Sequence, residues 1–121
     1  MAITLDHTIV PARDKEASAR LFAHLFGLEV ETPIGHFAAV RVNDTLTFDF
    51  ADRKTFEAHH YAFHVGEAEF DAIFARIKEA GLRYGSGPYA TEDGRINRRN
   101  GGRGVYFRDR DGHILELLTR P

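Results

Sequence analysis

The sequence contains no cysteine among its 121 residues. Disulfides, thiolate nucleophiles and sulfur-liganded zinc or iron–sulfur sites are therefore excluded. Any metal ion must be bound by nitrogen and oxygen atoms. This restricts metal-dependent functions to sites built from histidine, carboxylate and carbonyl groups.

The chain also lacks an excess of charge of one sign and a long apolar segment. Sixteen Lys and Arg residues against eighteen Asp and Glu residues give a formal net charge of −2, so no overall field favours nucleic acid or an anionic membrane. No apolar run approaches the ~20 residues of a membrane span, and the N-terminus lacks a secretory signal pattern. We expect a cytoplasmic protein with small-molecule or protein partners, but no nucleic acid and no membrane partner.

The first half of the chain predicts the order β-α-β-β-β. β-branched residues at positions 3–10 precede Pro11, and apolar residues at helical spacing follow Asp14, a candidate N-cap, until Gly27. Turn residues then separate three short segments with strand character. These segments are residues 28–30, 37–42 and 46–50.

The second half repeats this order. Residues 60–65 predict a strand and residues 67–80 a helix, closed by Gly81. His7 and His60 precede Gly27 and Gly81 by almost the same number of residues, and a leucine follows each glycine. Such a repeat indicates two copies of one structural unit. The remaining strands are expected at residues 82–84, 105–107 and 114–118.

The segment YFRDRDGHILEL predicts a β-hairpin. Arg110-Asp111-Gly112 fits a three-residue loop closed by a left-handed glycine, which would pair Tyr106 with Glu116 on the same face of the sheet. A two-residue loop would instead shift the pairing by one and place these two side chains on opposite faces.

With the paired units, the segments LDHTIV, HYAFHV and YFRDRDGHILEL resemble the vicinal oxygen chelate superfamily. This superfamily includes glyoxalase I, extradiol dioxygenases, fosfomycin-resistance enzymes and bleomycin-binding proteins. The closing motif is aromatic-x-Asp-x-Asp-Gly-x-x-x-Glu, although Arg110 replaces the usual proline. The resemblance implies an α+β fold in which paired βαβββ modules form an open curled-sheet barrel. It implies one domain over residues 1–121, with modules at about 3–52 and 59–120.

The resemblance implies that His7, His60 and Glu116 bind one divalent metal ion, which would be Fe(II), Mn(II), Ni(II), Co(II) or Zn(II). Two imidazoles and one carboxylate leave coordination positions for water or a bidentate substrate. The fourth ligand of glyoxalase I, a glutamate, is absent, because Thr45 lies near that position and Asp49 lies further along. The alternative is that these are two isolated strand histidines and a surface carboxylate.

Strand alternation separates the histidines of HHYAFHV. Residues 60, 62 and 64 share one face, whereas residues 61, 63 and 65 face the helices. His64 is a candidate hydrogen-bond partner of a metal-bound group or a candidate proton carrier; it is equally compatible with an exposed histidine that has no role. We assign the other histidines to solvent, namely His24, His36, His59 and His113.

Tyr106 precedes Glu116 by the spacing that extradiol dioxygenases use for a functional tyrosine, so the resemblance implies a catalytic role for it. The histidine that those enzymes place shortly before that tyrosine is absent here, and only His64 is a candidate to replace it. The fosfomycin-resistance pattern fits less well, because Ile9 occupies the position of its threonine.

One basic cluster comprises Arg95, Arg98, Arg99 and Arg103. Guanidinium groups match carboxylate and phosphate geometry, so this loop would clamp an anionic substrate if it closes over the site. The alternative is a solvated, mobile loop.

Two classes of function remain open. The first is a metal-dependent enzyme of dioxygenase, lyase or isomerase type that binds a small molecule through vicinal oxygens. The second is a metal-free protein that sequesters a drug or other small molecule, as bleomycin-resistance relatives do. The resemblance further implies a homodimer.

Overall fold

The computed structural model describes residues 2–121. The chain forms two compact units, divided between Glu57 and Ala58, and each is described separately. Both combine one long helix with one sheet, so the predicted α+β class is confirmed.

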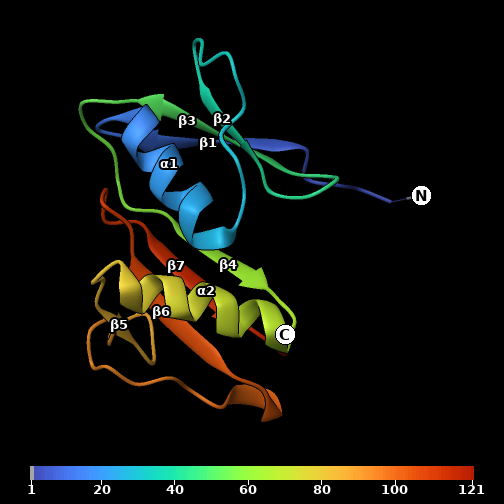
Figure 1. Ribbon diagram of the computed structural model, residues 1–121, viewed down its shortest axis with the longest axis vertical. Helices are drawn as coiled ribbons and strands as arrows, with labels where there is room; N and C mark the ends of the chain where they lie inside the picture. The colour runs from blue at the N-terminus through green and yellow to red at the C-terminus, as the bar shows by residue number, and fades with distance from the viewer. Residues whose placement is uncertain (1) are drawn as a thin grey trace. The chain divides into compact units, whose positions relative to one another are not determined.

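The first unit is a three-stranded sheet with a helix on one face (Figure 1). The sheet order is β1-β3-β2, with β1 parallel and β2 antiparallel to β3. The elements are β1 (His7–Ala12), α1 (Lys15–Phe26), β2 (Ala38–Arg41) and β3 (Thr47–Asp52).

The predicted ends of α1 are confirmed. The Asp14 side chain accepts a hydrogen bond from the backbone N–H of Ala17 at 3.2 Å, and Gly27 adopts a left-handed conformation with φ 70°. Phe22 of the helix stacks on Phe48 of β3 with ring centroids 5.2 Å apart. This aromatic contact holds α1 against the sheet.

The boundaries of β1 differ from the sequence prediction. The strand begins at His7 rather than at residue 3 and continues through Pro11 to Ala12. Because β1 lies at a sheet edge, the missing N–H of proline breaks no necessary ladder bond. The expected strand at residues 28–30 is reduced to a single bridge between Val30 and Val40.

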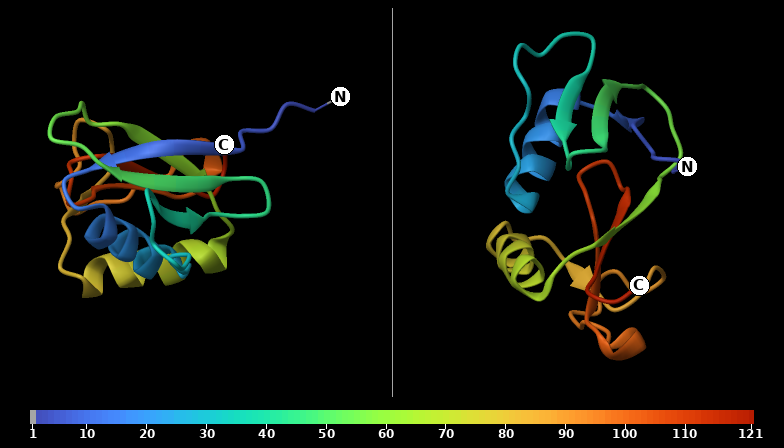
Figure 2. Two further views of the ribbon diagram at one scale, coloured as in Figure 1. Left: turned by 90° about the horizontal axis from the view of Figure 1, so that it is seen from above. Right: turned by 90° about the vertical axis from the view of Figure 1, so that its right-hand side faces the viewer.

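The second unit is a four-stranded sheet of order β4-β7-β6-β5, with α2 on one face (Figures 1 and 2). Parallel strands β4 and β7 are neighbours, and β6 pairs with β7 and β5 in antiparallel fashion. The elements are β4 (His60–His64), α2 (Glu67–Glu79), β5 (Tyr84–Gly85), the 3-10 turn η1 (Arg99–Gly101), β6 (Gly104–Arg108) and β7 (Ile114–Leu118).

The β6–β7 hairpin has the register predicted for a three-residue loop. Gly112 is left-handed with φ 85°, and the backbone N–H of Asp109 donates to the carbonyl of His113 at 3.0 Å. Tyr106 pairs directly with Glu116. Both side chains therefore lie on the same face of the sheet.

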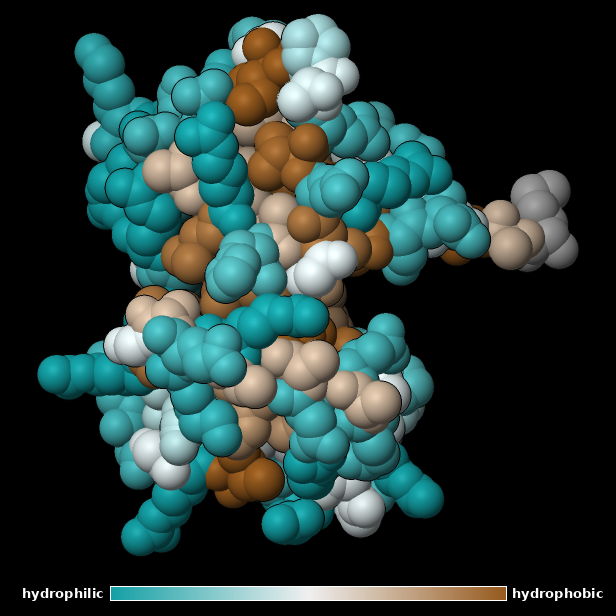
Figure 3. Space-filling model, viewed as in Figure 1, coloured by the Kyte–Doolittle hydropathy of each residue, from teal (hydrophilic) through white to brown (hydrophobic). Residues whose placement is uncertain are grey.

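Polar and charged residues cover most of the visible surface of each unit (Figure 3). Among residues 2–121, no helix has both the length and the apolar character that a membrane crossing requires.

Candidate functional site

The candidate site begins with His60 and Glu116, which lie on the neighbouring strands β4 and β7. The register places Ala62 beside Glu116, so His60 lies two residues away on the same face. The His60 Nε2 and Glu116 Oε1 atoms are 3.0 Å apart. The histidine side chain is 44% exposed and the glutamate 15%. One partner is therefore open to solvent and the other is largely enclosed.

Tyr106 and Arg99 extend this pair. The Arg99 Nη1 atom donates to the Tyr106 hydroxyl oxygen at 3.1 Å, and the hydroxyl is also hydrogen-bonded to Glu116. Burial, then the hydrogen bond to Glu116, raises the pKa of Tyr106, so the phenol keeps its proton at neutral pH. The phenol can thus donate to the carboxylate while it accepts from the guanidinium. His60, Glu116, Tyr106 and Arg99 form one connected network.

The His60–Glu116 pair fits a divalent metal ion. Two ligand atoms at right angles, each about 2.1 Å from an ion, are about 3 Å apart. The 3.0 Å separation of Nε2 and Oε1, which are joined by a hydrogen bond in this structure, is compatible with that requirement. The nitrogen and oxygen donors are also those that divalent transition metals accept.

His7 lies in the first unit, on β1. Its Nδ1 atom is 2.8 Å from Asp6 Oδ2, and this hydrogen bond is the main cause of its raised pKa. A carboxylate at Nδ1 favours the tautomer whose Nε2 lone pair is available to a metal. The role of His7 as a third ligand stays a prediction.

His64 lies on the same face of β4 as His60, as strand alternation predicted, and it is exposed. Its Nε2 atom is 3.2 Å from the carbonyl oxygen of Thr119. In the neutral ring, Nε2 therefore carries the proton and Nδ1 the lone pair.

The four arginines of the predicted cluster have different surroundings. Arg95 and Arg98 are exposed, and Arg99 belongs to the network around Tyr106. The Arg103 guanidinium pairs with Glu67 at 2.8 Å and with Asp71 at 2.9 Å on α2. It also lies over the ring of Phe70, 4.4 Å from the centroid. Arg103 thus joins the segment just before β6 to α2.

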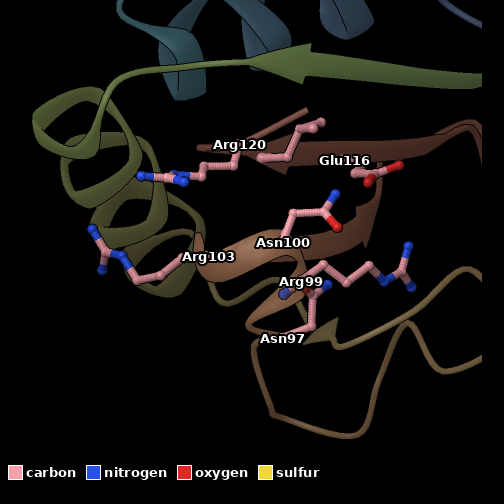
Figure 4. Close-up of a pocket in the computed structure, with 7 residues that line it drawn as sticks. Asn97, Arg99, Asn100, Arg103, Glu116 and Arg120 are labelled. Carbon is pink, nitrogen blue, oxygen red and sulfur yellow. The ribbon is translucent and has the colours of Figure 1, made fainter.

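A small pocket of about 90 Å³ opens beside Glu116 (Figure 4). Sequence reasoning missed Arg120, Asn97 and Asn100 in its lining, because no motif marks a residue just beyond a strand or within an irregular loop. The lining residues are Asn97, Arg99, Asn100, Arg103, Glu116, Leu118 and Arg120.

The assignment of His113 to solvent was wrong. Its side chain is 0% exposed, and its Nδ1 atom accepts a hydrogen bond from the backbone N–H of His59 at 2.8 Å. The ring thereby fixes the backbone immediately before His60. His24, His36 and His59 are exposed, as predicted.

Asp109, Asp111 and His113 form a second group with ligand atoms within 4.8 Å of one another, a spacing that a metal site allows. Asp109 Oδ1 already accepts from the backbone N–H groups of Asp111 and His113, each at 2.9 Å. Burial raises the pKa of Asp109. These hydrogen bonds stabilise the turn between β6 and β7, which explains why the three side chains lie close together.

Comparisons with known proteins agree with this fold. Residues 4–117 match the model of the glyoxalase/bleomycin resistance protein/dioxygenase superfamily. The solved structure of oxidase ChaP-H2 is 50% identical, covers 100% of this chain and 96% of its own, and superposes with a TM-score of 0.94. Oxidase ChaP-H1 is 48% identical, with coverages of 99% and 98% and a TM-score of 0.92.

Two curated proteins are more distant. Glutathione transferase FosA of Serratia marcescens is 27% identical over 97% of this chain and 81% of that protein. Metallothiol transferase FosB of Shouchella clausii is 37% identical over 50% of this chain, a match that spans only 37% of that protein. From the family match over residues 4–117, the chain belongs to the glyoxalase/bleomycin resistance protein/dioxygenase superfamily.

Proposed function

We propose that this protein is a metal-dependent enzyme that oxidises a small molecule bound through two adjacent oxygen atoms. The main support for this proposal is the network of His60, Glu116, Tyr106 and Arg99. It places nitrogen and oxygen atoms that can bind a metal ion next to a phenol and a guanidinium cation. The likeness to two oxidases near 50% identity favours oxidation over the isomerase and lyase alternatives.

His60 and Glu116 would hold the metal ion, with His7 as third ligand on the pattern of the superfamily. When bound, a divalent ion accepts vicinal substrate oxygens and stabilises the negative charge that develops on them. The ligand set suits Fe(II), Mn(II), Ni(II), Co(II) or Zn(II), and oxidation of the substrate by dioxygen favours a redox-active ion among these.

Tyr106 would orient Glu116. Its hydroxyl donates to the carboxylate and so restricts rotation of the side chain. The hydrogen bond from Arg99 holds the phenol in place and puts a positive charge beside the site. A substrate that loses a proton on binding would be stabilised by that charge.

His64 would accept the substrate proton. Its Nε2–H is directed at the Thr119 carbonyl, which leaves the Nδ1 lone pair as the basic atom. Arg95 and Arg98, together with Arg99, would supply positive charge from the loop for an anionic substrate. Arg103 is the weakest candidate of the four, because two carboxylates already pair with it.

Oxygen consumption tests this proposal. The protein loaded separately with Fe(II) and Mn(II) is incubated aerobically with a series of catechols, and Glu116→Gln serves as the variant that loses a ligand charge. We expect metal-dependent oxygen uptake that falls at least ~100-fold in the variant. Tight binding of the catechols without turnover in any metal form would instead favour the sequestration alternative.

A further inference from the structure

We propose that His113 is a positioning residue for His60, because its buried imidazole fixes the backbone from which the His60 side chain reaches Glu116. The inference rests on the proposed function, in which His60 and Glu116 bind the metal ion. His113 acts through the backbone of His59 and is not itself a ligand. Its loss should therefore change metal binding without removing any donor atom from the site.

The place of His60 in the sheet explains why its backbone needs such support. His60 is the first residue of β4, which is an edge strand in the order β4-β7-β6-β5. Residues 53–59 contain neither helix nor strand, so the regular ladder begins at His60. Backbone at the end of an element opens more readily than backbone in the middle of a sheet. A side chain at this position needs a further contact if it is to keep one place.

Both backbone polar groups of His59 are bound by the segment that leads into β7. The His59 carbonyl accepts from the backbone N–H of Ile114 at 2.9 Å, which continues the ladder by one residue. The His59 N–H donates to Nδ1 of His113 at 2.8 Å. Here a side chain takes the place of a backbone carbonyl. Without it, this partly buried N–H would lose its acceptor.

The acceptor atom is itself held in a fixed place. The His113 side chain is 0% exposed, and ring centroids of His59 and Tyr61 lie 5.0 Å and 6.1 Å from that of His113. Asp109 holds the His113 backbone twice. Its Oδ1 atom accepts from the His113 N–H at 2.9 Å, and its own N–H donates to the His113 carbonyl at 3.0 Å. The hairpin turn thus provides a rigid support for the backbone that enters β4.

A metal site depends on this kind of precision. Ligand distances in metal sites stay within about 0.2 Å of their ideal values, so even a small displacement of the His60 backbone should weaken binding. Residues that orient a ligand without touching the ion typically contribute about 10- to 100-fold in metal affinity. The contact of His113 is made one residue before His60, so its loss acts directly on the position of that ligand.

The experiment compares wild type with His113→Asn, His113→Leu and His113→Ala. Asparagine Oδ1 is separated from Cβ by the same number of bonds as histidine Nδ1, so it can accept from the His59 N–H. Leucine fills the space but has no acceptor. Alanine also lacks the acceptor, and it serves as the second variant if His113→Leu does not fold. Competition with a chromophoric chelator gives the dissociation constant for Co(II), and the visible absorption of bound Co(II) reports the ligand geometry.

We expect the two variants without an acceptor to bind Co(II) at least ~10-fold more weakly than wild type, with an altered visible spectrum. His113→Asn should stay within ~3-fold of wild type and keep its spectrum. Packing alone predicts the opposite order, because leucine fills the buried space better than asparagine. Ile77→Val is the matched control for a weakened core, since Ile77 is 0% exposed on α2. It should bind Co(II) as wild type does.

Equal Co(II) affinity in wild type and in the variants without an acceptor would overturn the positioning role of His113. A loss in His113→Asn as large as in those variants would also overturn it, because the packing of the ring would then be the cause. An equal loss in Ile77→Val would have the same consequence, because general destabilisation would explain the effect.

A measurement on the metal-free protein separates failure of this inference from failure of the proposed function. The ring centroids of His60 and Tyr106 lie 5.9 Å apart, so a nuclear Overhauser effect should join their ring protons. It should persist in His113→Asn and weaken in the variants without an acceptor. If wild type binds no divalent transition metal, the proposed function fails, but this pattern would still support the placement of His60 by His113. An unchanged effect in all variants would overturn that placement.

Discussion

The Tyr106 hydroxyl joins the His60–Glu116 pair to Arg99, and its removal breaks both of its hydrogen bonds while the aromatic ring stays. Tyr106→Phe should weaken metal affinity by about 10- to 100-fold, because Glu116 loses the donor that orients it. Competition with a chromophoric chelator measures the dissociation constant. Tyr84→Phe, on β5 of the same sheet, should leave it unchanged. Equal metal affinity in wild type and Tyr106→Phe would show that the hydroxyl does not support Glu116.

The buried side chain of His113 contributes to the stability of the fold, and a single substitution tests this role. His113→Ala should lower the free energy of unfolding by about 1–3 kcal/mol, because the His59 backbone N–H loses its acceptor and a cavity forms. Urea denaturation measures this change. His24→Ala, at an exposed position in the last turn of α1, should change it by less than about 0.5 kcal/mol. Similar values for the two variants would contradict the role assigned to His113.

These residues also show which parts of the site the sequence could predict. The pairing of Tyr106 with Glu116 follows from turn chemistry, because the loop length sets the register. The burial of His113 does not, because it depends on contact with His59, which lies just before β4 and is distant in the sequence. Arg120 was missed for the same reason, since its neighbours come from a loop that carries no periodic pattern.

At the scale of elements, the irregular segment between β5 and β6 is held by Asp93. Its carboxylate accepts from the Ser86 hydroxyl at 2.5 Å and from the backbone N–H groups of Ser86 and Arg95. The Ser86 hydroxyl is the largest cause of its lowered pKa. A lowered pKa means that this carboxylate stabilises the fold above its ordinary pKa and that the effect is lost as pH falls through the lowered value.

Asp93→Asn should therefore be less stable than wild type at neutral pH, and the difference should shrink below the ordinary value of 3.8. Urea unfolding at pH 7, 5 and 3 measures it. All other carboxylates are present in both proteins, so their titration does not contribute to the difference in the free energy of unfolding between wild type and Asp93→Asn. A difference independent of pH would mean that the Asp93 charge contributes nothing.

Elements with strong periodicity were predictable, and weakly patterned ones were not. Both long helices were located from apolar spacing and terminal glycines. Residues 3–6 have β-branched character, yet they lie outside β1, because β3 begins its pairing at His7 opposite Thr47. Propensity alone does not form a strand without a partner.

At the scale of the whole molecule, exposed apolar side chains near the start of the chain favour assembly. Ile3, Leu5 and Ile9 are 100%, 64% and 41% exposed near the start of the chain. Large apolar side chains at the surface favour contact with another protein surface. We expect a homodimer, detected as twice the chain mass by light scattering coupled to size exclusion. Ile3→Glu with Leu5→Glu should shift it toward the monomer, and a wild-type monomer at micromolar concentration would contradict the prediction.

Family membership constrains the whole molecule without fixing its chemistry, since one fold supports several reactions. The family match and the two oxidase structures extend over nearly the entire chain. The choice between enzyme and sequestration protein depends instead on the donors His7, His60 and Glu116, because the proposed oxidation requires the metal ion that they would bind.

Metal content is accordingly the first measurement to make. Protein purified without an affinity tag or chelator is examined by elemental analysis, with His60→Ala as the paired variant. The proposed mechanism requires about one equivalent of a divalent transition metal per chain, lost in the variant. No bound metal, together with no tight uptake of added Fe(II), Mn(II), Ni(II), Co(II) or Zn(II), would contradict the metal-dependent function.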